Sequence, residues 1–438
     1  MVEKYKLYYR LFIVLLWFPM VWGFVSQELL PILEPLSRPL FLLADILFLG
    51  LGCLLLRKKD DILVVGTFAV IGCISTIWIN HESVLSWFNG SRSYLGLLFA
   101  VPVLRYFMTF KYSGDFKNSI DRQLKFWLWL QAFCIVWQVV KYGAGDRVGG
   151  SIGNWGSGMV SMLIYLVSFY LVSQNWDSKA YLKSLYNNRC YILLLIPSFL
   201  NETKVSFILF ALYFLLLLRV DRTLWAKMIF IIPVFVTAII GVGTIYFQVT
   251  KLDSERVLSK EFMQDYLYGL DLDQIVELAL LVHDKEIEPD SSEWWAVDVP
   301  RFSKIALVIP VLSEHDGGVM FGAGLGQFKG GQMVEQTSFY KNNAWLLQGT
   351  KPWAFFVLVE LGVVGLCWLF PALYRAVIFR RKLGMLPKRM QAFVTITVSI
   401  ILVYNDSLSS YGYCLFLFYL TMISTYFGSR KDALVANG

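Results

Sequence analysis

Long runs of hydrophobic residues recur along nearly the whole chain and are separated by short polar segments. Because a helix needs roughly 20 apolar residues to cross a bilayer, these runs predict membrane-spanning helices, the shorter ones extending into their flanks. Twelve runs are expected to form spans, at about 9–25, 40–56, 62–79, 93–110, 126–140, 159–172, 190–200, 205–218, 228–247, 353–370, 392–404 and 414–427.

The sides of the membrane are predicted from lysine and arginine, which are enriched in short cytoplasmic loops. Basic residues gather at the two termini and in every second loop, namely 57–59, 111–125, 173–189, 219–227 and 371–391. Both termini are therefore predicted to be cytoplasmic, and the long segment 248–352 to lie outside. The first run follows basic residues as a signal peptide does, but without a small-residue cleavage site it is expected to remain as the first span.

One interruption needs a separate interpretation. Polar residues 201–204 divide the run 190–218 into halves that are each short for a span. A single long helix would place the basic loop 371–391 outside, so we expect two helices joined by an outer turn. If that turn dips into the membrane, its irregular backbone must be buried in protein or line a watery cavity.

The fold expected from this pattern is an all-α polytopic membrane protein in three parts. Residues 1–247 would hold nine spans, 248–352 a large extracytoplasmic loop, and 353–438 the last three spans. Within the loop, apolar residues at helical spacing predict amphipathic helices at 271–283 and 302–312. The loop is acidic whereas the rest of the chain is basic, and its helices indicate a folded cover on the membrane domain.

Composition excludes a soluble enzyme, because 57% of the residues are hydrophobic and only 16% are charged, against about 25% charged in soluble domains. The net charge of +7 does not indicate a nucleic-acid partner, since the basic residues are divided among loops rather than gathered on one surface. The six cysteines lie in or beside apolar runs, and the three histidines are far apart in sequence. The sequence therefore predicts no metal site and no cofactor.

Two arginines of the long loop, Arg256 and Arg301, are candidates for binding an anion. A guanidinium group matches phosphate bidentately, so two of them facing one cavity would hold a diphosphate. The alternative is that both are surface arginines paired with the acids of the loop. Lys204 and Glu360 are further candidates because ionisable residues within spans are costly unless they serve a function; a structural ion pair is the alternative for them.

Several short motifs follow one another along the chain, at 147–154, 203–206, 321–328 and 358–365. Their order resembles that of the bacterial O-antigen ligase and polysaccharide polymerase family, integral membrane glycosyltransferases of the GT-C class. Between Gly90 and Leu369 the similarity is patchy. Segment 147–154, which contains Arg147 and Asn154, is similar to an outer-loop motif of that family. Segment 203–206 resembles its Ser-Arg-Gly-Ala turn, with Lys204 where arginine is usual.

The later motifs also resemble the family in order. Arg256 and Arg301 look like its two arginines of the large periplasmic loop. Segment 321–328, with Gly322, Gly324 and Gly326, is similar to its glycine-rich closing motif, and 358–365 to the start of the next span. One departure is notable, because ligases tend to have a histidine about nine residues before Glu360, where this chain has Lys351.

This resemblance implies an undecaprenyl-diphosphate-linked glycan as donor, a sugar hydroxyl as acceptor, and a site at the periplasmic face of the bacterial inner membrane. The catalytic residues it implies are Arg256, Arg301, Lys351 and Glu360, without a metal. The binding residues it implies are Arg147, Asn154, Lys204, Gly322, Gly324 and Gly326. It also implies a chain-length regulator as a partner.

Three functions are compatible with the sequence. Lysine in place of the histidine favours a polymerase that joins lipid-linked repeat units over a ligase that transfers glycan to lipid A core. In either enzyme, fixed cations would stabilise the negative charge that grows on the departing diphosphate. A lipid-linked oligosaccharide flippase or other transporter is the third, although the chain shows no internal repeat.

Overall fold

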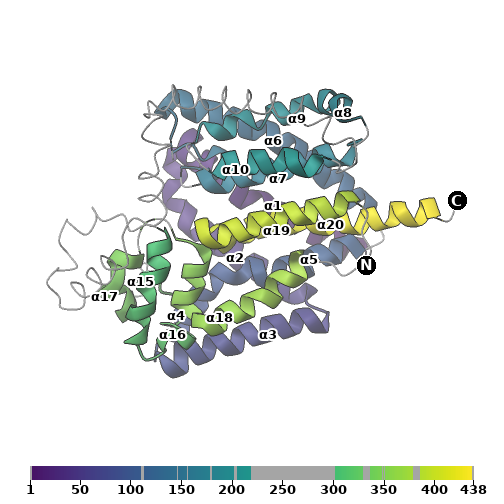
Figure 1. Ribbon diagram of the computed structural model, residues 1–438. Helices are drawn as coiled ribbons and strands as arrows, with labels where there is room; N and C mark the ends of the chain where they lie inside the picture. The colour runs from purple at the N-terminus through teal and green to yellow at the C-terminus, as the bar shows by residue number, and fades with distance from the viewer. Residues whose placement is uncertain are drawn as a thin grey trace.

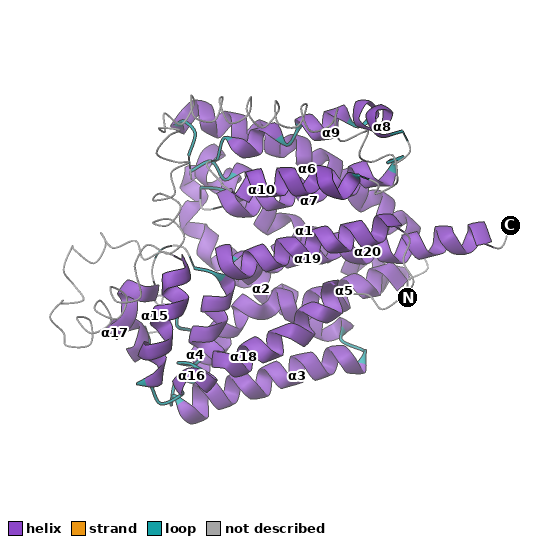
Figure 2. Cartoon of the chain, viewed as in Figure 1, coloured by secondary structure: helices purple, strands orange, loops and turns teal. Residues whose placement is uncertain are grey.

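The computed structural model (Figure 1) describes residues 2–109, 113–145, 147–154, 156–177, 180–201, 205–218, 301–328, 336–347, 349, 351–377 and 385–436. Within these ranges every regular element is a helix (Figure 2), as the sequence predicts. The predicted span 228–247, the predicted helix 271–283, Arg256 and Lys204 lie outside the described residues.

The longer helices form one bundle. They are α1 (Val2–Phe24), α2 (Ser37–Leu55), α3 (Lys59–Cys73), α5 (Leu95–Thr109), α6 (Ser113–Tyr142), α7 (Ser157–Gln174), α10 (Val205–Leu217), α18 (Trp353–Val377), α19 (Met385–Tyr404) and α20 (Tyr411–Ala436). In Figure 1, α1, α19 and α20 cross the middle, with α6, α7 and α10 on one side and α3, α5 and α18 on the other.

The shorter helices lie at the ends of the bundle. They are α4 (Val84–Ser91), α8 (Tyr181–Asn187), α9 (Arg189–Leu193), α15 (Arg301–Ser313), α16 (Gly318–Phe321) and α17 (Ser338–Leu347). Helices α15–α17 gather at the end of the bundle opposite the N and C termini (Figure 1). α15 matches the helix predicted at 302–312.

The number of spans is a point on which structure and sequence differ. Five segments of the described residues are long and apolar enough to cross a membrane: Glu3–Leu29, Pro31–Leu55, Lys59–Ile79, Ser157–Gln174 and Trp353–Ala376. Several other predicted spans correspond to shorter apolar helices, such as Val205–Leu217 and Tyr411–Ser424. An all-α membrane protein is therefore supported, whereas the count of twelve and the sidedness stay predictions.

Residues 190–200 differ from the continuous helix expected there. α9 ends at Leu193, and a 3-10 helix follows from Ile196 to Phe199. Pro197 lies at the start of that 3-10 helix, where its missing N–H is tolerated but an α-helix cannot run through it unchanged. The chain does turn afterwards, at Asn201, which is fully buried and donates from Nδ2 to Ser161 Oγ at 2.7 Å.

The centre of the bundle is formed by α5, α7 and the first half of α20, residues 411–423, whose side chains are almost all buried. Helices α2 and α3 lie at the periphery, because only 28% of each span is buried by the protein. Apolar side chains such as Leu54, Leu63 and Val70 are exposed on them. Surfaces of this kind are stable in the hydrocarbon of a bilayer and would be costly in water.

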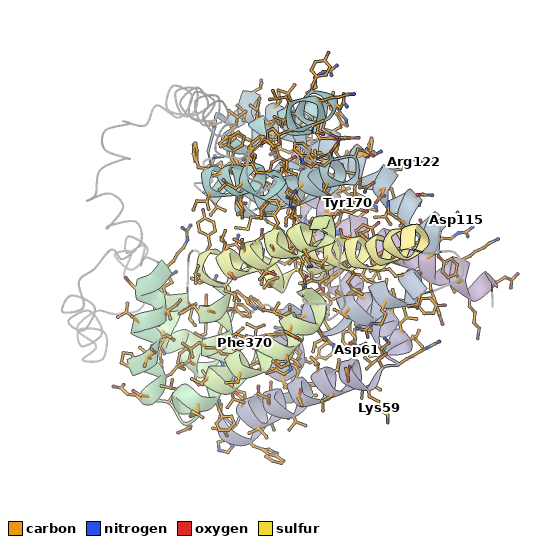
Figure 3. The ribbon with its side chains drawn as sticks, turned by 45° about the vertical axis from the view of Figure 1, so that its right-hand side comes forward. Lys59, Asp61, Asp115, Arg122, Tyr170 and Phe370 are labelled. Carbon is orange, nitrogen blue, oxygen red and sulfur yellow. The ribbon has the colours of Figure 1, made fainter. Side chains whose placement is uncertain are left out.

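A buried group of charges joins three helices near the termini. Asp61 of α3 pairs with Arg105 of α5 and with Arg375 of α18, the latter at 3.1 Å. The Arg375 guanidinium also donates to the carbonyls of Leu97 and Leu98. Asp61 lies inside this end of the bundle, close to exposed Lys59 of the same helix (Figure 3). Arg105 therefore forms an ion pair with Asp61 within the bundle instead of extending its charge to the membrane surface.

Candidate functional site

Arg301 lies at the start of α15, directly after Pro300 in sequence, and its guanidinium carbon is 4.1 Å from the centre of the Tyr404 ring. Tyr404 is the last residue of α19. Stacking on an aromatic face fixes the guanidinium plane while leaving its N–H groups directed to the side. The contact therefore brings the predicted arginine of the long loop onto the segment between α19 and α20.

Lys351 reaches the same segment from another direction. It precedes α18, and its charge interacts with that of Asp406, two residues after Tyr404. Its Nζ donates to the carbonyl of Gly349 at 3.3 Å and lies 5.8 Å from the centre of the Phe328 ring. Burial lowers the pKa of Lys351 from its ordinary value, and nearby Asp406 opposes part of this shift.

A third part of the chain approaches this point through α7. A side chain on Gly158 would lie 3.2 Å from Asn405 Nδ2, so the first turn of α7 is in close contact with the segment 404–406. Asn201 donates to the carbonyl of Ser157 at 3.1 Å. The turn that contains Lys204 in sequence therefore begins beside α7, although Lys204 itself lies outside the described residues.

The predicted outer loop 147–154 is held inside the bundle by two fully buried glutamines of α6. The N–H of Gly150 donates to Gln138 Oε1 at 2.7 Å, and that of Ser151 donates to Gln131 Oε1 at 2.9 Å. In an apolar interior these amides replace the water that would otherwise satisfy irregular backbone. Irregular backbone is thus buried in protein here, whereas the turn for which this was predicted, 201–204, lies outside the described residues after Asn201.

The two predicted binding residues of this loop differ in environment. Arg147 is exposed, and no described contact ties it to Tyr404 or Asp406. Asn154 is partly buried, and its N–H donates to Gln27 Oε1 at 2.8 Å. Its side-chain Oδ1 is buried without a hydrogen-bond partner among the described residues. Asn154 therefore keeps an acceptor that a donor group of a ligand or a water molecule would satisfy.

Glu360 and the glycine-rich segment form a buried joint rather than an open site. Glu360 is completely buried in α18, and its Oε1 accepts the N–H of Gly326 at 2.8 Å. Thr76 Oγ1 accepts the N–H of Leu325 at 2.8 Å from the other side. The carboxylate expected to act in catalysis instead holds backbone of the segment 321–328, because a buried carboxylate is stable only when donors surround it.

Glycines are required in this segment because its backbone packs directly against neighbouring backbone. Gly322, Gly324 and Gly326 all have positive φ, of 68°, 89° and 102°. A side chain on Gly322 would lie 2.6 Å from the carbonyl oxygen of Val359, and one on Gly326 would lie 2.8 Å from that of Ser86. They serve backbone packing against α18 and α4, which is a different role from the ligand binding expected of them.

The joint nevertheless reaches the cationic residues. The glycine-rich segment ends at Phe328, whose ring stacks on Phe356 of α18 at 4.3 Å between centres. The ammonium group of Lys351 lies over the same ring. Glu360 does not contact Lys351 in this arrangement. It holds the glycine-rich segment through Gly326, and that segment carries Phe328, whose ring lies beneath the Lys351 ammonium group.

The segment 404–406 is the part of this site that sequence reasoning missed. Tyr404 is the last residue of the predicted span 392–404, Asp406 lies in the short connection to the next span, and neither belongs to a recognised motif. The available signal was an aromatic residue at the end of a predicted span, followed closely by an acid. The described residues contain no group of three His, Cys, Asp or Glu side chains suited to a metal ion.

The arrangement is suited to binding an anion at the end of the bundle opposite the termini. It joins a stacked guanidinium, a partly desolvated ammonium and a nearby carboxylate, supplied by three separate parts of the chain. No family model, curated protein or solved structure matches this chain.

Proposed function

We propose that this protein is a membrane glycosyltransferase that polymerises undecaprenyl-diphosphate-linked repeat units at the outer face of the inner membrane, without a metal. The observation that carries the proposal is the convergence of Arg301 and Lys351 on the segment 404–406. They are separated by 50 positions in sequence, and each contacts or interacts with this segment from a different element. The family resemblance of the surrounding motifs supplies the substrate class.

In the proposed reaction, a hydroxyl oxygen of the acceptor sugar forms a bond to the anomeric carbon of the donor glycan. The bond from that carbon to the lipid diphosphate breaks, and the electron pair leaves with the diphosphate. Arg301 and Lys351 stabilise the charge that develops there, and such preorganised cations act most strongly where water is excluded.

The proton of the acceptor hydroxyl needs a base. Asp406 supplies a carboxylate close enough to Lys351 to influence its charge, whereas Glu360 is buried and binds Gly326. We assign proton acceptance to Asp406 and a positioning role to Glu360. Arg256 and Lys204 remain proposed contacts of the diphosphate, Arg147 and Asn154 proposed contacts of the glycan.

A transporter is the second candidate, and one observation favours it. α18 contains a non-helical residue, Gly362, within the apolar span Trp353–Ala376. Broken helices of this kind are typical of the substrate sites of transporters. In this chain the break is filled by the glycine-rich segment, which favours a rigid joint over a moving gate.

One experiment tests the polymerase and the transporter. Purified protein is reconstituted in vesicles of phosphatidylethanolamine and phosphatidylglycerol and is supplied with lipid-linked repeat units. We expect longer lipid-linked glycans on a gel together with released undecaprenyl diphosphate. Arg301→Ala should slow elongation by about 10²–10³-fold, the usual loss when one group that stabilises transition-state charge is removed. Arg57→Ala, which removes an arginine that also lies over a tyrosine ring but outside the site, should leave the rate unchanged.

Translocation of intact units without elongation by the wild type would establish a transporter instead. Transfer of glycan to added lipid A core, without elongation of the lipid-linked units, would establish a ligase. Normal elongation by Arg301→Ala would remove Arg301 from the mechanism.

A further inference from the structure

An apolar pocket of about 320 Å³ lies between α2, α3, α4 and the beginning of α5. Its walls are aliphatic and aromatic side chains that include Leu49, Phe68 and Phe99. Pockets of this size are large enough to bind ligands. None of the residues assigned above to glycosyl transfer lines it.

The two charged residues at one end of the pocket are paired with each other, and almost all of the pocket surface is apolar. Arg92 donates to Asp45 through Nε at 2.7 Å and pairs with it through a terminal nitrogen at 2.6 Å. Its other terminal nitrogen donates to Asn89 Oδ1 at 3.1 Å. Because the charges at this end already compensate each other, the pocket needs no ion and no cluster of water molecules.

The pocket is elongated along α2. Asp45 and Cys53 both line it and are eight residues apart on that helix, which corresponds to about 12 Å. It therefore extends along about two turns of an apolar span. An elongated hollow with almost wholly apolar walls matches a hydrocarbon chain.

The pocket also faces the bilayer. Cys53 lines it and is itself exposed, and α2 and α3 are the least covered of the apolar spans, together with exposed neighbours such as Leu54 and Val70. In a membrane, acyl chains surround this opening in very large excess, so even weak binding would fill it. An empty apolar hollow would forfeit the dispersion contacts of its walls.

We propose that this pocket binds one acyl chain of a bilayer phospholipid, which packs along the apolar walls formed by α2 and α3. This binding site does not depend on the proposed function. It does adjoin the glycine-rich joint, because a side chain on Gly72 would meet both Trp87 of the pocket and Leu325 of the segment 321–328. A bound chain thus packs against the wall that supports the joint.

Photochemical labelling of the full chain tests the proposal. The protein is reconstituted in vesicles of phosphatidylethanolamine and phosphatidylglycerol in which some phosphatidylethanolamine carries a diazirine midway along one acyl chain. It is then extracted and washed in detergent before irradiation, so that only retained lipid reacts. We expect cross-links at the pocket residues Leu49, Cys53 and Ala69, and few at the outward residues Leu54 and Leu63.

Two pairs of variants provide matched controls. Ala69→Phe and Leu49→Trp add bulk inside the pocket, whereas Gly66→Phe and Gly50→Trp add it on the same helices at positions with nothing within 4 Å. The pocket variants should retain about tenfold less labelled lipid than the wild type, or less still. A loss of this size is expected if the added side chain displaces even two methylene groups of the acyl chain from the pocket. The outward variants should keep it.

A variant is scored only if it elutes from size-exclusion chromatography as the wild type does, which shows that it is folded. One folded pocket variant is enough to test the proposal. Equal labelling of outward residues, or full labelling of a folded pocket variant, would overturn the proposal. In a parallel arm, undecaprenyl phosphate bearing a photoreactive group replaces the labelled phospholipid. Cross-links in the pocket from that probe alone would assign it to a prenyl tail and overturn the acyl-chain assignment.

Discussion

At the scale of single residues, burial rather than residue type decides what each charged side chain does. Lys351 and Glu360 are both predicted from the sequence to act in catalysis, yet Glu360 is fully enclosed and bound to backbone, whereas Lys351 is partly exposed beside Asp406. An enclosed carboxylate can hold a segment in place but cannot meet a sugar. Only Lys351 combines access with a shifted proton affinity.

The lowered pKa of Lys351 predicts a pH dependence. Desolvation disfavours the ammonium form, so its charge is present below the lowered pKa and is lost as pH rises through it. We expect the elongation rate to decline on the alkaline side, at a lower pH than it would with an ordinary lysine of pKa 10.5. Lys351→Arg keeps the cation at every working pH and should move that decline to higher pH.

The measurement is the initial rate of elongation between about pH 7 and pH 10, a range in which arginine stays protonated. Lys341→Arg, at an exposed lysine of α17, is the control and should leave the profile unchanged. If Lys351→Arg declined at the same pH as the wild type, the titrating group would be another one.

At the scale of elements, the break in α18 is the feature on which the site depends. Gly362 has φ 63° and ψ −159°, a conformation essentially restricted to glycine. A side chain there would lie 2.3 Å from the carbonyl oxygen of Met320. The break therefore lets α16 and the glycine-rich segment pack against the middle of α18, where Glu360 binds Gly326.

Gly362→Ala should consequently destabilise the protein. The strained backbone alone costs about 1–3 kcal/mol, and the contact with Met320 adds to it. We expect a lower midpoint of thermal unfolding in detergent and slower elongation by the folded fraction. Gly66→Ala, on an exposed face of α3 with open space around it, should change stability by less than about 1 kcal/mol and in the favourable direction. An unchanged midpoint for Gly362→Ala would mean that the joint is not fixed as described.

At the scale of the whole molecule, the two ends of the bundle differ in chemistry. One end carries both termini and the buried ion pairs of Asp61, and the other carries α15–α17 and the convergent cations (Figures 1 and 3). Lys59 at the start of α3, which belongs to a loop predicted to be cytoplasmic, lies at the first end. The sidedness of the other basic loops stays a prediction.

This arrangement predicts which positions are accessible from outside the cell. In a variant whose exposed cysteines Cys53, Cys190 and Cys367 are replaced by alanine, Lys341→Cys should react with a membrane-impermeant maleimide on spheroplasts with an intact inner membrane. Lys58→Cys should react only after permeabilisation, because it lies in the loop between α2 and α3. The readout is gel shift of the labelled chain, and the parent without added cysteine is the control. The reverse pattern would place the proposed site in the cytoplasm.

Much of the helix pattern could be predicted because it depends on local composition. The apolar runs at 40–56, 159–172 and 353–370 lie in α2, α7 and α18, and the spacing at 302–312 lies in α15. Breaks were harder to predict, since Pro197 and Gly362 interrupt runs whose hydrophobicity continues without change. Hydrophobicity reports the environment of a segment, not whether its backbone stays helical.

The sequence by itself determined that this is a helical membrane protein with isolated charges in apolar surroundings, because transfer of a segment into hydrocarbon depends on its own residues. Only the tertiary structure decided which charges meet. Arg301, Lys351 and Asp406 are brought together by α15, α18 and the end of α19, while Glu360 is assigned to the backbone of Gly326. Contacts of this kind depend on packing between helices distant in sequence, and a charge's function depends on the neighbours and the desolvation that this packing gives it.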